Sequence, residues 1–76
     1  MKELVEVLAR ALVDNPGAVQ VRETGGTHSA VVELRVDPDD MGKVIGRQGR
    51  VVKAIRTVVK AAGTKQGRKV SVEVVQ

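Results

Sequence analysis

Two glycines separated by two residues, Gly46 and Gly49, lie in the middle of the most basic part of the chain. Because glycine has no Cβ, the backbone at such positions can approach a ligand closely. Arg47 lies between the two glycines and Arg50 follows them, so cations would surround this backbone. This spacing indicates a site that binds an anion through backbone amides and basic side chains, rather than a site that makes or breaks bonds.

Basic residues are concentrated in one part of the sequence. The chain of 76 residues has a formal net charge of +4, but residues 41–69 carry nine Lys or Arg and no Asp or Glu. Residues 1–40 carry four basic and eight acidic residues. A local patch of this kind favours a polyanion, and a phosphodiester chain suits it better than a lone phosphate because the cations continue beyond the glycines. The alternative is a solvated basic face that keeps the protein in solution.

Glycine motifs for nucleotide cofactors do not fit this segment. The dinucleotide fingerprint needs its first two glycines two residues apart, and the P-loop needs Gly-Lys followed by Ser or Thr. Here Gly49 is followed by Arg50 and Val51, and neither motif would follow directly from a strand. A mononucleotide site is therefore disfavoured.

Hydrophobic periodicity predicts the elements before this segment. Apolar residues fall on one face of Lys2 to Asp14, which predicts an amphipathic helix that ends at Asn15-Pro16-Gly17. Alternation of apolar and polar residues predicts a strand over 19–22 and a return strand over Ala30 to Val36, joined by a turn over 24–28.

An acidic segment predicts the start of the next helix. Asp37 can cap it, Pro38 suits its first position, and Asp39 and Asp40 lie at the positive end of its dipole. Capping explains these aspartates better than a Mg²⁺ site or acid–base chemistry. Only a short helix fits before Gly46.

A longer helix is predicted from about Arg50 to Ala62, with Gly63 as its C-terminal stop and residues 64–67 as a loop. At 100° per residue its sequence separates into two faces. The predicted apolar face is formed by Val51, Ala54, Ile55, Val58, Val59 and Ala62, and the opposite basic face by Arg50, Lys53, Arg56 and Lys60. Alternating Val70, Val72 and Val74 predict a last strand.

The element order is therefore α-β-β-α-α-β. The first two strands form a hairpin and pair antiparallel, while the two-helix crossover makes the last two strands parallel. The predicted fold is an α+β single domain over residues 1–76, with a three-stranded mixed sheet covered on one face by three helices.

The segment Val44-Ile45-Gly46-Arg47-Gln48-Gly49, placed between two helices, resembles the GxxG loop of KH domains, which clamps about four backbone nucleotides. The element order resembles the type II KH arrangement. Over essentially its whole length the chain is similar to the small bacterial KH-domain RNA-binding proteins of the KhpA family. This resemblance implies an RNA chaperone that forms dimers, pairs with a larger KH protein called KhpB, and acts in post-transcriptional control linked to cell elongation and cell-wall homeostasis.

The expected site combines the loop, the cations around it and an aliphatic wall for the bases. Its expected RNA-binding residues are Gly46, Arg47, Gln48, Gly49, Arg50, Lys53, Lys43 and Ile45. Val44 and Val52 are further candidates for the aliphatic wall, and the alternative for both of them and for Ile45 is an ordinary core position. The chain has no Phe, Trp or Tyr, so modules that stack bases on exposed rings are excluded.

Composition also bears on other classes of protein. The chain has no Cys, and its one histidine, His28, lies in a predicted turn, so no metal site and no cofactor are expected. No Ser–His–Asp arrangement is supported, so an enzyme is not expected. Nothing resembles a signal peptide or a bilayer-spanning segment, and the expectation is a soluble, cytoplasmic domain.

Two questions stay open at the level of sequence. Lys65, Arg68 and Lys69 form a second basic cluster, which either contacts phosphates or is a solvated loop. The whole chain either binds single-stranded RNA, with single-stranded DNA as a variant, or serves as a protein-interaction and dimerisation adaptor with weak or no RNA binding of its own.

Overall fold

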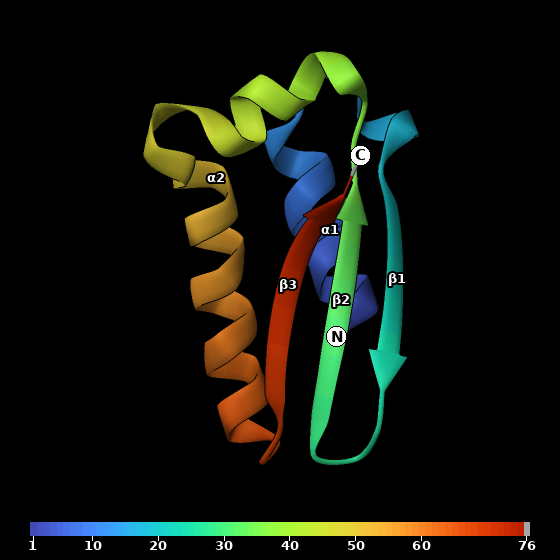
Figure 1. Ribbon diagram of the computed structural model, residues 1–76, viewed down its shortest axis with the longest axis vertical. Helices are drawn as coiled ribbons and strands as arrows, with labels where there is room; N and C mark the ends of the chain where they lie inside the picture. The colour runs from blue at the N-terminus through green and yellow to red at the C-terminus, as the bar shows by residue number, and fades with distance from the viewer. Residues whose placement is uncertain (76) are drawn as a thin grey trace.

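The computed structural model describes residues 1–75, apart from the side chains of Arg47 and Gln48. Two helices, a short 3-10 helix and three strands follow one another along the chain (Figure 1). They are α1 (Lys2–Leu12), η1 (Pro16–Ala18), β1 (Gln20–Gly25), β2 (Ser29–Arg35), α2 (Pro38–Lys65) and β3 (Lys69–Val75).

The three strands form one mixed sheet in the order β1-β2-β3. β1 and β2 pair antiparallel, with Val21 opposite Leu34, and β2 and β3 pair parallel, with Val32 opposite Val72. The predicted hairpin and the predicted parallel crossover are therefore confirmed.

α2 is assigned as one helix but consists of two arms that meet at a sharp bend (Figure 1). Gly49 lies at this bend with a φ of +67°, in the left-handed region that interrupts an α-helix. We call residues 38–48 the first arm and residues 50–65 the second arm. Together with α1 they give the predicted α-β-β-α-α-β order, and the type II KH arrangement is confirmed.

The core lies between the sheet and the helices. α1 lies behind the sheet in Figure 1, and the second arm of α2 runs alongside β3. The opposite face of the sheet is uncovered and carries mostly polar side chains. Val21 of β1 packs against this core and is partly buried. The fully buried part of the core comes from the other larger elements and includes Val5, Ala9, Val32, Leu34, Val44, Val52, Ile55, Val59 and Val72.

The sequence before α2 explains why the helix begins at Pro38. The Asp37 side chain accepts a hydrogen bond from the backbone N–H of Asp39 at 2.9 Å, and Pro38 occupies the first helical position. The expectation that Asp40 also serves as a cap was wrong. Asp40 is 1 % exposed, and its carboxylate accepts hydrogen bonds from the backbone N–H groups of Asp14 and Asn15 at 3.2 and 3.0 Å. It therefore joins the loop after α1 to α2.

The C-terminal end of α2 differs from the prediction. The helix continues past Gly63 to Lys65, and Gly67, with a φ of +71°, makes the turn into β3. Gly63 has a packing role instead. A Cβ there would lie 2.9 Å from the backbone oxygen of Arg68 and 3.1 Å from Cγ2 of Val70, so glycine allows α2 to approach the start of β3 closely.

This close approach also determines which face of the second arm is buried. Val52, Ile55 and Val59 lie on the same helical face as Gly63 and are buried against the sheet. The predicted apolar face was therefore partly wrong, because Ala54 is exposed and Val58 is 41 % exposed. The second arm is therefore rotated about its own axis relative to the orientation that would bury the whole predicted apolar face. Other boundaries move by a few residues: α1 ends at Leu12, and β1 begins at Gln20 and includes Thr24 and Gly25.

Within residues 1–75, none of the helices is both long and apolar enough to cross a membrane. The same described part of the chain holds no cluster of three or more His, Asp or Glu that could bind a metal ion.

Candidate nucleic-acid interface

The bend between the two arms of α2 is open to solvent rather than packed into the core. A Cβ at Gly46 or at Gly49 would meet no atom within 4 Å. The conformation of Gly49 requires glycine, because its φ of +67° strains other residues. Gly46 has no positive φ, and a side chain at this position would clash with nothing. The fold therefore does not require glycine at Gly46, but its absence of a side chain leaves the backbone accessible to a ligand.

The side chains of Arg47 and Gln48 lie outside the described residues. Their backbones belong to α2, between the two glycines. Their expected roles stay predictions.

A cleft of about 310 Å³ lies between the start of the second arm and the end of β3, and Gly49 is one of its lining residues. We call it the α2–β3 cleft, and it is lined by Ile45, Gly49, Val52, Lys53, Arg56, Glu73 and Val74. Ile45 is 53 % exposed, which suits a wall that contacts a ligand. Val52 contributes to both core and cleft. Val44 is fully buried, so the core interpretation of this residue is confirmed.

A second cleft, of about 600 Å³, borders the first arm and the beginning of the second. This first-arm cleft is lined by Gly42, Lys43, Gly46, Arg50 and Val51. Gly46 borders this cleft and Gly49 borders the α2–β3 cleft. The bend therefore connects the two hollows.

The cations at the bend differ in what they contact. Arg50 and Lys53 are exposed, and neither is within ion-pair distance of a carboxylate among the described side chains. Lys43 instead pairs with Asp14, at 2.9 Å between Nζ and Oδ1. Both partners of this pair are largely exposed, so it stabilises the fold by about 1 kcal/mol at most and can be exchanged for a phosphate.

Arg56 lines the α2–β3 cleft and is hydrogen-bonded to the backbone of β3. Its Nε and Nη2 donate hydrogen bonds to the carbonyl oxygen of Val72, at 3.2 and 3.1 Å. Val72 belongs to β3, an edge strand whose outer backbone groups have no neighbouring strand. Arg56 therefore joins α2 to this edge.

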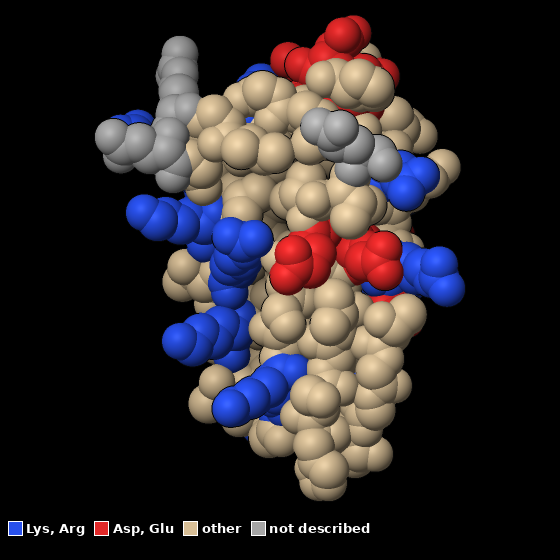
Figure 2. All heavy atoms as spheres, in the orientation of Figure 1, with Lys and Arg blue, Asp and Glu red and all other residues tan. Residues whose placement is uncertain are grey.

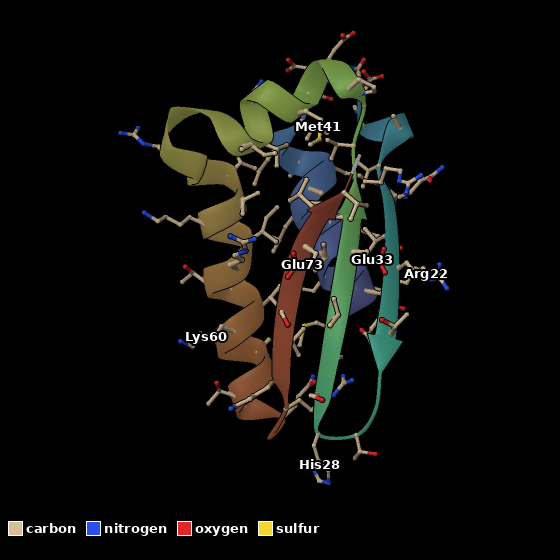
Figure 3. The ribbon with its side chains drawn as sticks, in the orientation of Figure 1. Arg22, His28, Glu33, Met41, Lys60 and Glu73 are labelled. Atoms are coloured by element: carbon tan, nitrogen blue, oxygen red, sulfur yellow. The ribbon has the colours of Figure 1, made fainter. Side chains whose placement is uncertain are left out.

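Basic and acidic side chains are unevenly distributed on this side of the molecule. Figure 2 shows Lys and Arg in a column over α2, acidic side chains over the middle of the sheet and at one end of the molecule, and further basic side chains at the sheet edge away from α2. Figure 3 places Glu33 and Glu73 on β2 and β3, and Lys60 on the second arm. A polyanion is therefore attracted to the helix side of the α2–β3 cleft, whereas Glu73 adds a negative charge on its β3 side.

Glu73 borders the cleft but was not among the expected site residues. Its position in the last strand, far along the chain from Gly49, gives no local signal, and alternation shows only that it points away from the core. Its place beside the bend depends on β3 being the edge strand next to α2.

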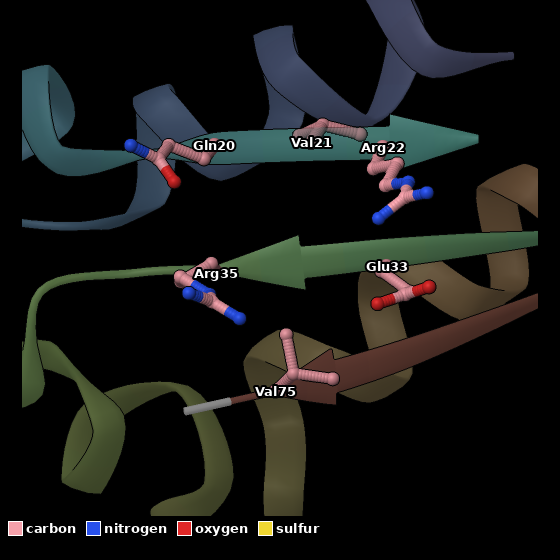
Figure 4. Close-up of a pocket in the computed structure, with 6 residues that line it drawn as sticks. All are labelled: Gln20, Val21, Arg22, Glu33, Arg35 and Val75. Carbon is pink, nitrogen blue, oxygen red and sulfur yellow. The ribbon is translucent and has the colours of Figure 1, made fainter.

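The uncovered sheet face carries a separate, shallow depression of about 230 Å³ (Figure 4). Arg22, Glu33 and Arg35 line it, with Arg22 directly opposite Glu33 in the sheet register. This depression carries both signs of charge and includes no residue of the bend, so it is a weaker candidate for a polyanion.

The comparisons with known proteins decide the family. A family model described as the KH domain of KhpA/KhpB matches residues 2–74. The chain belongs to this family. A KH domain is a binding module, so the chain is not an enzyme.

Individual relatives resemble this chain in both length and sequence. It is 60 % identical over 75 residues to the RNA-binding protein KhpA of Clostridium perfringens, covering 99 % of this chain and 100 % of that protein. It is 47 % identical over 76 residues to the protein of the same name from Aquifex aeolicus, covering 100 % and 96 %. The corresponding Streptomyces coelicolor protein is 49 % identical over 75 residues, covering 99 % and 91 %. No solved structure matches.

Proposed function

We propose that this chain binds single-stranded RNA, with the sugar–phosphate backbone seated on the bend at Gly46–Gly49. The observation that carries this proposal is an open backbone bend at which glycine is free of packing, bordered by Arg50 and Lys53, which form no ion pair among the described side chains. The names of the relatives, which describe them as RNA-binding proteins, support the same ligand.

The arrangement gives each part of the RNA a chemically suitable surface. The second arm of α2 begins at the bend, so its first backbone N–H groups and its dipole favour a phosphate there. Arg50 and Lys53 add charge, with Lys43 available once it leaves Asp14. In this proposal Arg47 and Gln48 occupy the variable positions of a GxxG loop.

The bases would lie in the α2–β3 cleft, against Ile45, Val52 and Val74. Because the chain has no aromatic residue, these contacts lack the stacking that strengthens many single-strand binders. We therefore expect weak binding by one copy. Nothing in this aliphatic wall distinguishes ribose from deoxyribose, so single-stranded DNA is a second ligand of the same site.

The salt dependence of RNA binding by the isolated chain tests the proposal. If about four phosphates are neutralised, log K should fall with log salt with a slope of about −3. Fluorescence anisotropy with a labelled, unstructured RNA measures this slope. A slope near zero, or no binding at low salt, would contradict the proposed function.

The helical layer leaves apolar side chains for a second protein. Val7 of α1 is 66 % exposed, Leu12 is 38 % exposed, and Val58 of the second arm is 41 % exposed. Burial of such residues between two copies would stabilise a dimer, and two linked sites would compensate for weak binding by one. We therefore include in the proposal a homodimer, or a heterodimer with a larger KH protein of the KhpB type.

The wider role follows from the family resemblance. The family model covers both KhpA and KhpB, which supports a partnership between the two kinds of protein. On this basis the chain acts in the cytoplasm as an RNA chaperone, in post-transcriptional control linked to cell elongation and cell-wall homeostasis. RNA crosslinked to the protein in cells and then sequenced would identify its targets.

A protein-interaction adaptor is the second candidate function, and the exposed Val7 and Val58 favour it. An adaptor would form a stable dimer or a stable complex with its protein partner while the isolated chain shows no salt-sensitive association with RNA. Sedimentation of the chain with and without RNA separates the two functions, because an RNA-binding module gains mass on RNA addition and an adaptor does not.

A further inference from the structure

A third cleft, of about 390 Å³, continues between the second arm and the beginning of β3. We call it the Lys60 cleft, and it is lined by Lys60, Thr64, Arg68, Lys69, Val70 and Ser71. The same two elements line the α2–β3 cleft. Helix rise of about 1.5 Å per residue separates the Cα atoms of Gly49 and Lys60 by about 16 Å along the arm.

The two clefts follow one another along the seam between the second arm of α2 and β3. Arg56 lines the first of them and is fixed to the carbonyl oxygen of Val72, between Val74 of the first cleft and Val70 of the second. A strand that leaves the bend along the α2–β3 cleft therefore meets the Lys60 cleft next.

The chemistry of the Lys60 cleft suits phosphate. No carboxylate is among its lining residues, and two hydroxyl groups, of Thr64 and Ser71, can donate hydrogen bonds. Lys60 and Lys69 are exposed, and neither forms an ion pair with another described residue.

The three residues of the second basic cluster, Lys65, Arg68 and Lys69, differ in what they contact. Arg68 donates to the carbonyl oxygen of Gly26 at 3.0 Å and pairs with Glu23 at 3.6 Å, so it stabilises the turn between β1 and β2. Lys65 lies in the last turn of α2, where it complements the helix dipole, and does not line the cleft. Arg68 and Lys69 of this cluster line the cleft, and of these two only Lys69 forms no ion pair among the described residues.

We propose that the Lys60 cleft is a second phosphate-binding subsite, which extends the RNA footprint beyond the nucleotides held at the bend. This inference rests on the proposed function. A KH loop clamps about four backbone nucleotides, so short RNA would occupy the bend alone. Longer RNA would run along the seam and place later phosphates at Lys60 and Lys69.

The test compares RNA of about 4 and about 12 nucleotides on wild-type protein and on the variant Lys60→Gln/Lys69→Gln. Affinity of the variant for the longer RNA should fall about tenfold, and its salt slope should become shallower by about 1.4, because two phosphate contacts are lost. Affinity for the short RNA should not change. The variant Lys2→Gln/Arg10→Gln removes the same charge from α1 and should alter neither affinity by more than about twofold.

Two results would overturn the subsite. One is an equal loss for short and long RNA, which would indicate a general effect of charge, and the other is no loss for the longer RNA. With either result, wild-type protein would still bind the short RNA, so the proposed function would stand while the subsite would not. If wild-type protein binds neither RNA, the proposed function itself fails and the subsite fails with it.

Discussion

The variant Arg47→Asp/Gln48→Asp is expected to bind single-stranded RNA at least about 100-fold more weakly than wild-type protein. The two substitutions change the charge of the bend by three units, where the proposal places the phosphates. Repulsion would replace attraction at that point, and the accessible backbone of Gly46 and Gly49 could no longer be used. Anisotropy titrations at low salt measure the loss, and denaturation in urea shows whether the fold is kept.

A charge-matched control separates a local effect from the net charge of the protein. Lys2→Asp/Thr24→Asp changes the charge by the same three units on exposed positions of α1 and β1, and neither residue lines any of the three clefts beside α2. Its affinity should stay within about threefold of wild type, because screening limits the reach of exposed charges. An equal loss in both variants, or a folded loop variant with full affinity, would exclude the bend as the binding site.

Asp40→Ala is expected to lower the free energy of unfolding by about 2 to 3 kcal/mol. The Asp40 carboxylate is 1 % exposed and accepts hydrogen bonds from two backbone N–H groups and from Nδ2 of Asn15, at 3.0 to 3.3 Å. Its removal leaves these donors without their acceptor and frees the loop after α1 from α2. Urea unfolding followed by circular dichroism measures the change.

Asp39→Ala provides the comparison within the same helical turn. Asp39 is exposed, and its side chain forms no hydrogen bond or ion pair with the described residues. We expect a cost of about 0.5 kcal/mol from its favourable interaction with the helix dipole. If the two alanine variants unfold at the same urea concentration, Asp40 is not the link that the structure shows.

The sequence was sufficient for most of the fold because its strongest signals are local. Alternating valines predict strands, and Asp37-Pro38 predicts a helix start that the structure confirms at hydrogen-bond level. The two-helix crossover then requires a parallel pair. The bend was also predictable, because two glycines in a long apolar and basic helical pattern mark an interruption.

The predictions that were wrong involve contacts between residues far apart in the sequence, which local sequence patterns do not reveal. Gly63 was interpreted as a helix stop because nothing nearby in sequence shows that Val70 packs on it. The same contact rotates the second arm and leaves Val58 exposed. Asp40 was assigned to its own helix, whereas its hydrogen-bond donors are 25 and 26 residues away.

The site was predicted in part for the same reason. Residues of the loop and helix, such as Arg50 and Lys53, follow from spacing, since one helical face presents them together. Glu73 and Lys69 come from the edge strand and reach the clefts only through the topology of the sheet. Lys43 was expected to bind RNA, and its ion pair with Asp14, 29 residues away, has no signal in the local sequence.

The most direct measurement of the central claim is RNA affinity and stability determined together for Gly46→Ala. A Cβ at this helical position meets no atom within 4 Å, so alanine should raise the free energy of unfolding by up to about 1 kcal/mol. If RNA backbone lies against Gly46, the same methyl group should weaken RNA binding about tenfold, a cost of about 1.4 kcal/mol.

Gly17→Ala is the control, because Gly17 also has open space at its Cβ position without a positive φ, and it lines none of the three clefts beside α2. It should gain similar stability and keep its RNA affinity within about twofold. Our account predicts that Gly46→Ala alone becomes more stable and binds RNA more weakly. A stabilised Gly46→Ala protein that binds RNA as tightly as wild type would contradict it.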